Sequence, residues 1–224
     1  SRSMKRSSDL RSETAIPALG RRAFLQASVV AAAVAAIPAV ASANDDVDLE
    51  MILHDPAAPV TGNLMGNLTM VAFLDYNCPW CKKAAVPMRE AVVKDGGVRL
   101  VYKDWPIITR DSVDGARLAL AAKYQGRYDA VHEALMAIKT PKAKAGEMRD
   151  AVERTTGVDF ARLQDDLAKH EAEIAALLER NGRQAMSLGL NGTPAFIVGK
   201  YLVPGAIQSV DAFTDLFAKA RQPV

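Results

Sequence analysis

Hydrophobic residues in the middle of the chain follow patterns that predict alternating strands and helices. A continuous apolar run over 68–74 predicts a buried strand, and the apolar positions of 82–94 recur at the spacing of an amphipathic helix. A second strand is expected over 98–102, after a helix end marked by Gly96 and Gly97. So compact a strand–helix–strand unit implies a right-handed crossover and a parallel pair of strands.

The second half of the chain is dominated by helical patterns. Apolar residues at three- and four-residue spacing continue from 112 to 188, and they predict helices whose inner faces pack together. The expected helices are 112–122, 128–138, 142–155, 160–170 and 171–188. A hairpin that turns at Gly199-Lys200 and a final helix over 210–220 follow. The predicted order is therefore β-α-β, a block of helices, then β-β-α.

The first 43 residues have the pattern of an export signal and not of a folded core. A basic, polar segment ends in Arg21-Arg22, an apolar stretch rich in small residues runs over 27–40, and Ala-Ser-Ala at 41–43 resembles a cleavage site. We expect a signal peptide cleaved near Ala43. The alternative is an uncleaved membrane anchor, although the stretch is short for a transmembrane helix. The paired arginines favour twin-arginine export over an ordinary secretory signal.

Composition and charge narrow the function of the rest of the chain. Half of the 224 residues are hydrophobic, which is enough for one domain with a decorated core or two small ones. Residues 1–43 hold six basic and two acidic residues, so the formal net charge of +2 becomes −2 without them. No basic patch indicates nucleic acid as a partner. We expect an exported protein that acts in the periplasm of a bacterium.

The chain has only two cysteines, Cys78 and Cys81, and they stand three residues apart between the first predicted strand and its helix. Cys78 should therefore lie at the first turn of a helix, where free N–H groups and the helix dipole stabilise a thiolate. Pro79 suits the first helical position, which needs no N–H. Residues three apart share one face of a helix, so the two sulfurs are within reach of a disulfide. We interpret the pair as a redox-active dithiol.

Two other interpretations of the pair are weaker. A C-x-x-C pair can be half of a zinc site, but zinc takes about four ligands. The chain has no second cysteine pair, and His54, His132 and His170 are scattered. A purely structural disulfide would close so short a loop that it would stabilise the chain little. We therefore expect no metal, and no cofactor besides the redox-active Cys78–Cys81 disulfide.

The element order, with Cys-Pro-Trp-Cys after the first long strand and Thr-Pro opening the late hairpin, resembles the thioredoxin fold. More narrowly, the chain is similar to the DsbA family of bacterial thiol–disulfide oxidoreductases, in the branch that carries Asp-Tyr-x-Cys-Pro-x-Cys, here 75–81. The resemblance covers about residues 51–220 and implies an α/β fold with an inserted helical domain. The expected parts are a signal peptide (1–43), an N-terminal arm with an edge strand (44–66), the first part of the thioredoxin fold (67–110), the helical insertion (111–190) and the second part of the thioredoxin fold (191–224).

The resemblance also implies roles for individual residues. Cys78 would be the exposed nucleophile and Cys81 the buried resolving thiol. Pro194 would be a cis-proline that faces the disulfide, an uncommon bond that is kept for a reason. The cis bond would turn the backbone of Thr193 outward, so that an extended substrate could pair with it beside Cys78.

The dipeptide between the cysteines, Pro79-Trp80, bears on reactivity. The indole of Trp80 adds an apolar contact for peptide substrates next to Cys78. It lacks the imidazolium that other members of the family place there. We therefore expect the pKa of Cys78 to be depressed less than in those relatives.

One position departs from the family. Many relatives have a buried glutamate six residues before the first cysteine, a candidate proton acceptor for the buried thiol, and here that position is Ala72. Proton transfer from Cys81 would then need water, Lys103 or Asp104, the last two near the end of the second strand. Asp75 is a further accessory candidate, although a turn-capping role for its side chain fits the pattern at least as well.

The function predicted from the sequence is that of a periplasmic oxidase, which introduces disulfides into exported proteins with cysteines and is reoxidised by a quinone-linked membrane partner. The alternative is an isomerase or reductase kept reduced by a membrane electron donor. Such enzymes usually oligomerise through an added N-terminal segment, and little chain is available for one here. A third hypothesis is a non-catalytic binding or metal-handling protein on the same fold, against which the intact cysteine pair and Thr193-Pro194 argue.

Overall fold

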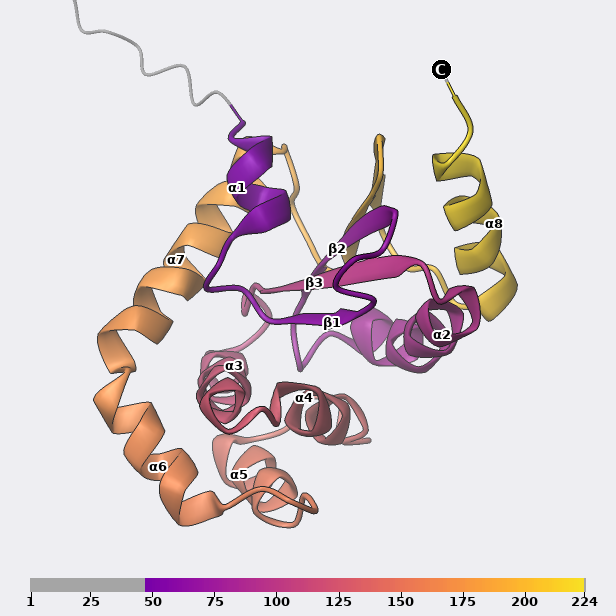
Figure 1. Cartoon of the computed structure of the whole chain (residues 1–224). Coiled ribbons are helices and arrows are strands. Elements are labelled where there is room, and N and C mark those ends of the chain that lie inside the picture. Colours follow the sequence, from indigo (N-terminus) through magenta and orange to yellow (C-terminus); the bar gives the residue numbers. More distant parts are fainter. Residues whose placement is uncertain (1–46, 224) are drawn as a thin grey trace, which may run out of the picture. The chain divides into compact units, whose positions relative to one another are not determined.

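The structure, a computed structural model of the chain, describes residues 47–223 (Figure 1). The predicted signal peptide over 1–43 lies outside these residues. In the described part, helices cover both faces of a five-stranded sheet. No helix between residues 47 and 223 is both long and apolar enough to cross a membrane.

The sheet has the strand order β1-β3-β2-β4-β5. The strands are β1 (Val60–Gly62), β2 (Leu68–Leu74), β3 (Val98–Asp104), β4 (Ala195–Val198) and β5 (Tyr201–Pro204). The central strand β2 runs parallel to β3, and the other pairs are antiparallel. Strands β2 and β3 are buried at nearly every position, as the apolar run of β2 requires, and the burial of β3 extends to its charged last residues, Lys103 and Asp104. The predicted parallel pair, edge strand at Val60 and late hairpin are all present.

Two helices pack on one face of the sheet. Helix α2 (Pro79–Asp95) follows β2 directly, and helix α8 (Val210–Ala220) ends the fold beside it (Figure 1). The inner side of α2 buries apolar residues at helical spacing, which are Cys81, Ala84, Met88, Ala91 and Val92. Phe213 of α8 meets Phe196 of β4 edge-to-face, with ring centroids 5.5 Å apart. This packing fixes the start of α2 against the end of β2.

Helices fill the chain between β3 and β4. They are α3 (Arg110–Ala122), the short 3-10 helix η1 (Lys123–Gln125), α4 (Tyr128–Met136), α5 (Ala145–Glu153), α6 (Phe160–Lys169) and α7 (Glu171–Ser187). Helix α4 packs against α2, while α7 returns along the edge of the molecule toward β3 (Figure 1). Their apolar stripes merge with the core under α2, so the sheet and the inserted helices share one large hydrophobic cluster.

Helix α5 begins at Ala145, three residues later than the predicted start at 142. The backbone N–H and C=O of Ala143 are both hydrogen-bonded to the side chain of Asn77, at 2.9 and 3.0 Å. The N–H groups of a first helical turn are free in any case, but a helix that began at 142 would use the carbonyl oxygen of Ala143 for its own hydrogen bond, and Asn77 holds that oxygen instead. The long-range contact therefore overrides the local helical pattern.

The opposite face of the sheet is covered by α1 (Leu49–His54) and the end of α7. Ile52 of α1, Phe73 of β2 and Ala185 of α7 belong to a second, smaller core cluster. Trp105 closes this cluster and meets the ring of Phe73 edge-to-face at 6.3 Å. The two clusters use alternate residues of the same strands, as the pleat requires.

A buried ion pair joins these elements behind the sheet. Lys103 Nζ lies 3.2 Å from the carboxylate of Asp55, and Arg180 of α7 adds two hydrogen bonds of 2.9 and 3.0 Å to the same carboxylate. Lys103 is completely buried. Burial by itself would raise the pKa of Asp55, but Arg180, the backbone N–H of Ala57 and the charge of Lys103 outweigh it and leave the pKa below its usual value.

We predict that Asp55→Ala destabilises the fold strongly, because the mutation leaves the ammonium of Lys103 buried without a partner. Breaking one side of a buried pair costs about 3–5 kcal/mol in free energy of unfolding. Urea denaturation followed by circular dichroism measures the change. The matched control is Glu133→Ala, which breaks the exposed Arg89–Glu133 pair and should cost less than about 1 kcal/mol. Equal losses in the two variants would contradict the prediction.

Candidate active site

Cys78 is the N-terminal capping residue of α2. Its sulfur accepts a hydrogen bond from the backbone N–H of Cys81 at 3.3 Å, and Pro79 occupies the first helical position. Both local features were predicted from the sequence. The predicted exposure of Cys78 is wrong, however, because only 2% of the residue is accessible. The loop before β4 lies over the sulfur, and the carbonyl oxygen of Thr193 is 3.2 Å from it.

That loop is brought to the cysteines by strand pairing. Strand β2 runs antiparallel to β4, with Phe73 opposite Ala195, so the segment before β4 meets the segment after β2. The Thr193–Pro194 peptide bond is cis. Residues 115 positions apart in the sequence, Cys78 and Thr193, are thereby in direct contact. The same loop lines a cavity of about 380 Å³, whose walls include Pro194 and Leu202.

The two sulfurs differ sharply in acidity. The pKa of Cys78 is lowered to about 6, mainly by a hydrogen bond from the thiol of Cys81; burial opposes this shift, while Thr193 and backbone N–H groups of the first helical turn add to it. The pKa of Cys81 is raised far above its usual value, first by burial and then by its hydrogen bond to Cys78 and by the charge there. In the reduced state, which the structure represents, one sulfur is a thiolate at neutral pH and the other is a thiol.

The residues just before Cys78 fasten the site to the inserted helices. The carboxylate of Asp75 accepts hydrogen bonds from the backbone N–H groups of Asn77 (2.7 Å), Ile107 (2.7 Å) and Ile108 (2.8 Å). The amide of Asn77 in turn binds the Thr109 hydroxyl at 2.8 Å. With its oxygens engaged by three backbone donors, Asp75 has the anchoring role that the turn-capping interpretation gave it.

Apolar side chains are exposed around this anchor. Trp80 stands next to Cys78 and is 48% exposed, with the ammonium of Lys83 4.5 Å from its ring centroid. Ile107 and Ile108, held by Asp75, are also exposed, at 44% and 41%. Exposed apolar groups beside a reactive sulfur offer a contact surface for an unfolded or extended polypeptide.

The two strand-end candidates for proton transfer point in opposite directions. Lys103 and Asp104 are neighbours in β3, so their side chains leave opposite faces of the sheet. Lys103 is bound to Asp55 on the face away from α2, so the prediction that it serves Cys81 is wrong. Asp104 lies on the α2 face, where its carboxylate accepts a hydrogen bond of 3.0 Å from the hydroxyl of Tyr128.

Asp104 belongs to a buried polar group that sequence reasoning missed. The hydroxyl of Tyr76 lies 3.5 Å from that of Tyr128 and 3.0 Å from Nδ1 of His132. Tyr76 stands within the Asp-Tyr-x-Cys motif, which was a signal for the site, but no pattern linked Tyr128 or His132 to it. Burial raises the pKa of Asp104 to about 7, although hydrogen bonds from both tyrosines oppose the rise. Among residues 47–223, no cluster of three or more metal-binding side chains occurs.

Comparisons with known proteins agree with this geometry. Residues 69–218 match the model of the family described as DSBA-like thioredoxin domain. The chain is similar to a thioredoxin-like oxidoreductase from Silicibacter pomeroyi, with 39% identity, a TM-score of 0.72, and coverage of 78% of this chain and 98% of the other. It is also similar to a periplasmic thioredoxin-like protein from Salmonella enterica serovar Typhimurium, with 28% identity, a TM-score of 0.66, and coverage of 77% and 95%.

A third solved structure, the thiol-disulfide exchange protein alpha-DsbA2 from Wolbachia pipientis, shares the fold at 24% identity and a TM-score of 0.70 over 76% of this chain and 90% of the other. Among curated proteins, the chain is 27% identical over 156 residues to Na(+)/H(+) antiporter NhaA 1 of a Mycobacterium strain, and it spans about a quarter of that protein's length. The predicted fold class, an α/β thioredoxin fold with an inserted helical domain, is confirmed. The chain belongs to the family of DSBA-like thioredoxin domains.

Proposed function

We propose that this protein is a thiol–disulfide oxidoreductase, acting as an oxidase that introduces disulfides into exported proteins through Cys78 and Cys81. The observation that carries the proposal is the unequal acidity of the two sulfurs, with the pKa of Cys78 lowered to about 6 and that of Cys81 raised by burial. The stable thiolate lowers the free energy of the reduced form of such a pair, and its disulfide is therefore a stronger oxidant. The similarity to a thioredoxin-like oxidoreductase supports the thiol–disulfide oxidoreductase part of the proposal.

The reaction begins with the Cys78–Cys81 disulfide. A substrate thiolate attacks Cys78, the bond between the cysteines breaks, and Cys81 leaves and takes a proton. A second thiolate of the substrate attacks the substrate sulfur of the mixed disulfide, and Cys78 leaves as a thiolate. The substrate has then lost two electrons and gained a disulfide, and the enzyme has gained both electrons. A membrane partner linked to quinones would reoxidise the pair.

The loop before β4 and the exposed apolar residues fit polypeptide substrates. Thr193 stands where an extended chain could run alongside the loop, and Trp80, Ile107 and Ile108 offer contacts for its side chains. Periplasmic action is supported by the export pattern of the first 43 residues and by the similarity to a periplasmic protein of Salmonella.

Thiol trapping in cells tests the direction of electron flow. Cells are quenched in acid, and free thiols are alkylated with a reagent large enough to change electrophoretic mobility. An oxidase should be found with the Cys78–Cys81 pair mostly oxidised. A mostly reduced pair would overturn the oxidase proposal in favour of an isomerase or reductase kept reduced by a membrane electron donor.

The acidity of Cys78 should be visible in its alkylation rate. The thiolate reacts and the thiol does not, so the rate with iodoacetamide should rise with pH through a midpoint near 6. Cys81→Ala removes the hydrogen bond that contributes most to this shift and should move the midpoint upward. A wild-type midpoint at ~8.5, the value of a free cysteine, or at ~3.5 would contradict the assignment.

Substitution of each cysteine should have a different consequence. Cys78→Ser should abolish oxidation of a reduced, unfolded test protein, because no sulfur remains for the substrate to attack. Cys81→Ser should leave Cys78 able to attack a disulfide in a second test protein, which releases one thiol and leaves a mixed disulfide that no second enzyme sulfur can displace. Non-reducing gels of the two variants would show adducts, removable with a reductant, only for Cys81→Ser. Adducts in both variants, or in neither, would count against the assigned roles.

A further inference from the structure

The proposed function requires a group that exchanges the proton of the Cys81 thiol. Cys81 is completely buried and must gain a proton when the disulfide opens and lose it when the disulfide re-forms. Ala72, in the middle of β2 and on the same face as the core under α2, has no acidic side chain to serve it. Whatever exchanges this proton must be buried near the start of α2 and must itself reach solvent.

Asp104 is a buried acid in the right layer. Strand register pairs it with Leu74, and the backbone N–H of Trp105 binds the carbonyl oxygen of Leu74 at 2.8 Å. The backbone of Asp75, the next residue, lies within hydrogen-bonding reach of the Cys81 thiol. Asp104 therefore lies on the strand next to β2, level with the residue that precedes Asp75.

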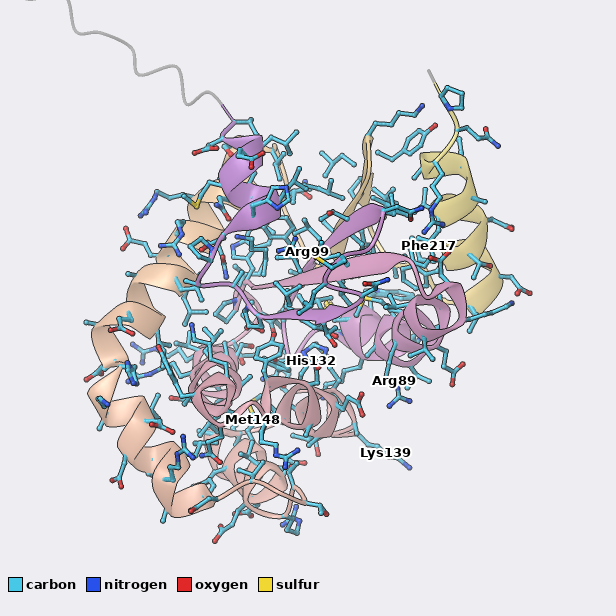
Figure 2. The ribbon with its side chains drawn as sticks, viewed as in Figure 1. Arg89, Arg99, His132, Lys139, Met148 and Phe217 are labelled. Atoms are coloured by element: carbon cyan, nitrogen blue, oxygen red, sulfur yellow. The ribbon has the colours of Figure 1, made fainter. Side chains whose placement is uncertain are left out.

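A chain of polar groups leads from Asp104 toward the surface. The hydroxyl of Tyr128 donates to Asp104 at 3.0 Å, the two tyrosine hydroxyls are 3.5 Å apart, and the hydroxyl of Tyr76 is 3.0 Å from Nδ1 of His132. Figure 2 shows His132 in the layer between the sheet and α4. Nε2 of His132 is buried and has no hydrogen-bond partner among the described residues. Among the described residues, the ring is thus hydrogen-bonded at one nitrogen only.

His132 lines an open cavity of about 680 Å³ between α2 and the helices α4 and α5. Lys82 and Arg89 of α2 and Arg154 stand along its walls, while alanines make up much of the rest. A cavity of this size has room for water molecules, and His132 belongs to its wall although its Nε2 is buried. The polar chain therefore runs from a buried carboxyl group to the wall of a cavity that water can fill.

We propose that Asp104 exchanges the proton of Cys81, and that Tyr128, Tyr76 and His132 connect Asp104 to the cavity. The inference rests on the proposed oxidase function. When a substrate thiolate opens the disulfide, Cys81 leaves as a thiolate and takes the proton of neutral Asp104, which is reloaded from the cavity. During reoxidation, the thiol of Cys81 returns its proton to the Asp104 carboxylate as its sulfur attacks the mixed disulfide on Cys78.

The surroundings of Asp104 allow its carboxyl group both to donate and to accept a proton near neutral pH. Burial raises its pKa to about 7, the hydrogen bonds from Tyr128 and Tyr76 oppose this rise, and the charge of Asp75 adds to it. Near neutral pH, both forms of the carboxyl group are therefore populated. Burial lowers the pKa of His132 to about 3, so the ring is neutral at the same pH and can relay a proton between its two nitrogens.

The other groups around Asp104 do not change their protonation near neutral pH. Tyr102 and the two bonded tyrosines have raised pKa values because of burial, so they stay neutral. Asn181 of α7 donates to the backbone oxygen of Asp104 and carries no charge. Lys103, the adjacent cation, is paired with Asp55 on the opposite face of the sheet.

Rapid-quench kinetics with glutathione disulfide separates the two steps of enzyme oxidation. The reduced full chain is mixed with glutathione disulfide, quenched in acid at intervals, and analysed by mass spectrometry. Attack by Cys78 gives a glutathione adduct, and attack by Cys81 then releases glutathione and leaves the internal disulfide. We expect the rate of the second step to rise with pH through an inflection near 7.

Asp104→Asn should slow the second step at least about tenfold, which is the size of effect expected when a proton acceptor is lost. It should also remove the inflection from the pH profile of that step. The first step should change less than about twofold. Tyr128→Phe removes a hydrogen bond that holds the pKa of Asp104 down, so its inflection should move to higher pH. This shift keeps the proposal testable if the Asn variant does not fold, and a purely structural role would not produce it.

Tyr102→Phe is the matched control. The ring of Tyr102 packs at a tilt against those of Tyr128 and His132, with centroids 5.1 and 4.6 Å apart, yet its hydroxyl makes no hydrogen bond to another residue within 47–223. This variant should keep the wild-type inflection. A wild-type pH profile in Asp104→Asn, or an unmoved inflection in Tyr128→Phe, would overturn the proton route. A wild-type protein that forms no glutathione adduct at all would instead overturn the proposed oxidoreductase function.

Discussion

The site depends on an unequal division of solvation between two sulfurs three residues apart. Cys78 caps α2, where backbone N–H groups and the Cys81 thiol stabilise a negative charge, whereas Cys81 lies one turn deeper in an apolar core. A helix start supplies donors only within its first turn, so a small displacement of α2 against the sheet would erase this difference. The packing of α2 on β2 and α8 is therefore part of the chemistry.

Three consecutive residues before Cys78 hold the start of α2 in place. Asp75 binds the loop after β3, Tyr76 reaches α4, and Asn77 holds the loops at Thr109 and Ala143. All of these contacts are buried or partly buried, and each joins the segment before Cys78 to a part of the chain at least 30 residues away. The inserted helices are thus more than a cover over the thioredoxin-like sheet, because they determine where the loop that carries the nucleophile can lie.

The local half of this arrangement could be predicted from the sequence. The capping position of Cys78 follows from the end of the strand, the proline after it and the spacing of the cysteines. All three are features of residues close together in the sequence. The covering of Cys78 by Thr193, the late start of α5 and the direction of Lys103 could not be predicted in the same way. Each depends on which distant backbone or charge occupies the neighbouring space: the loop before β4, the amide of Asn77, or the carboxylate of Asp55.

Lys103 and Asp104 illustrate why neighbouring charged residues at a strand end can have unrelated roles. The alternation of a strand sends Lys103 to a face where Asp55 and Arg180 complete an ionic cluster, and a buried charge that is fully paired has little freedom to change its protonation. Within residues 47–223, the side chain of Asp104 is hydrogen-bonded by tyrosine hydroxyls on the other face, and these bind a carboxylate without supplying an opposing charge. A buried carboxyl group in such surroundings titrates near neutral pH, which is the property that proton exchange with a buried thiol requires. Pairing with a cation would stabilise the fold at that position and would remove the capacity to exchange a proton.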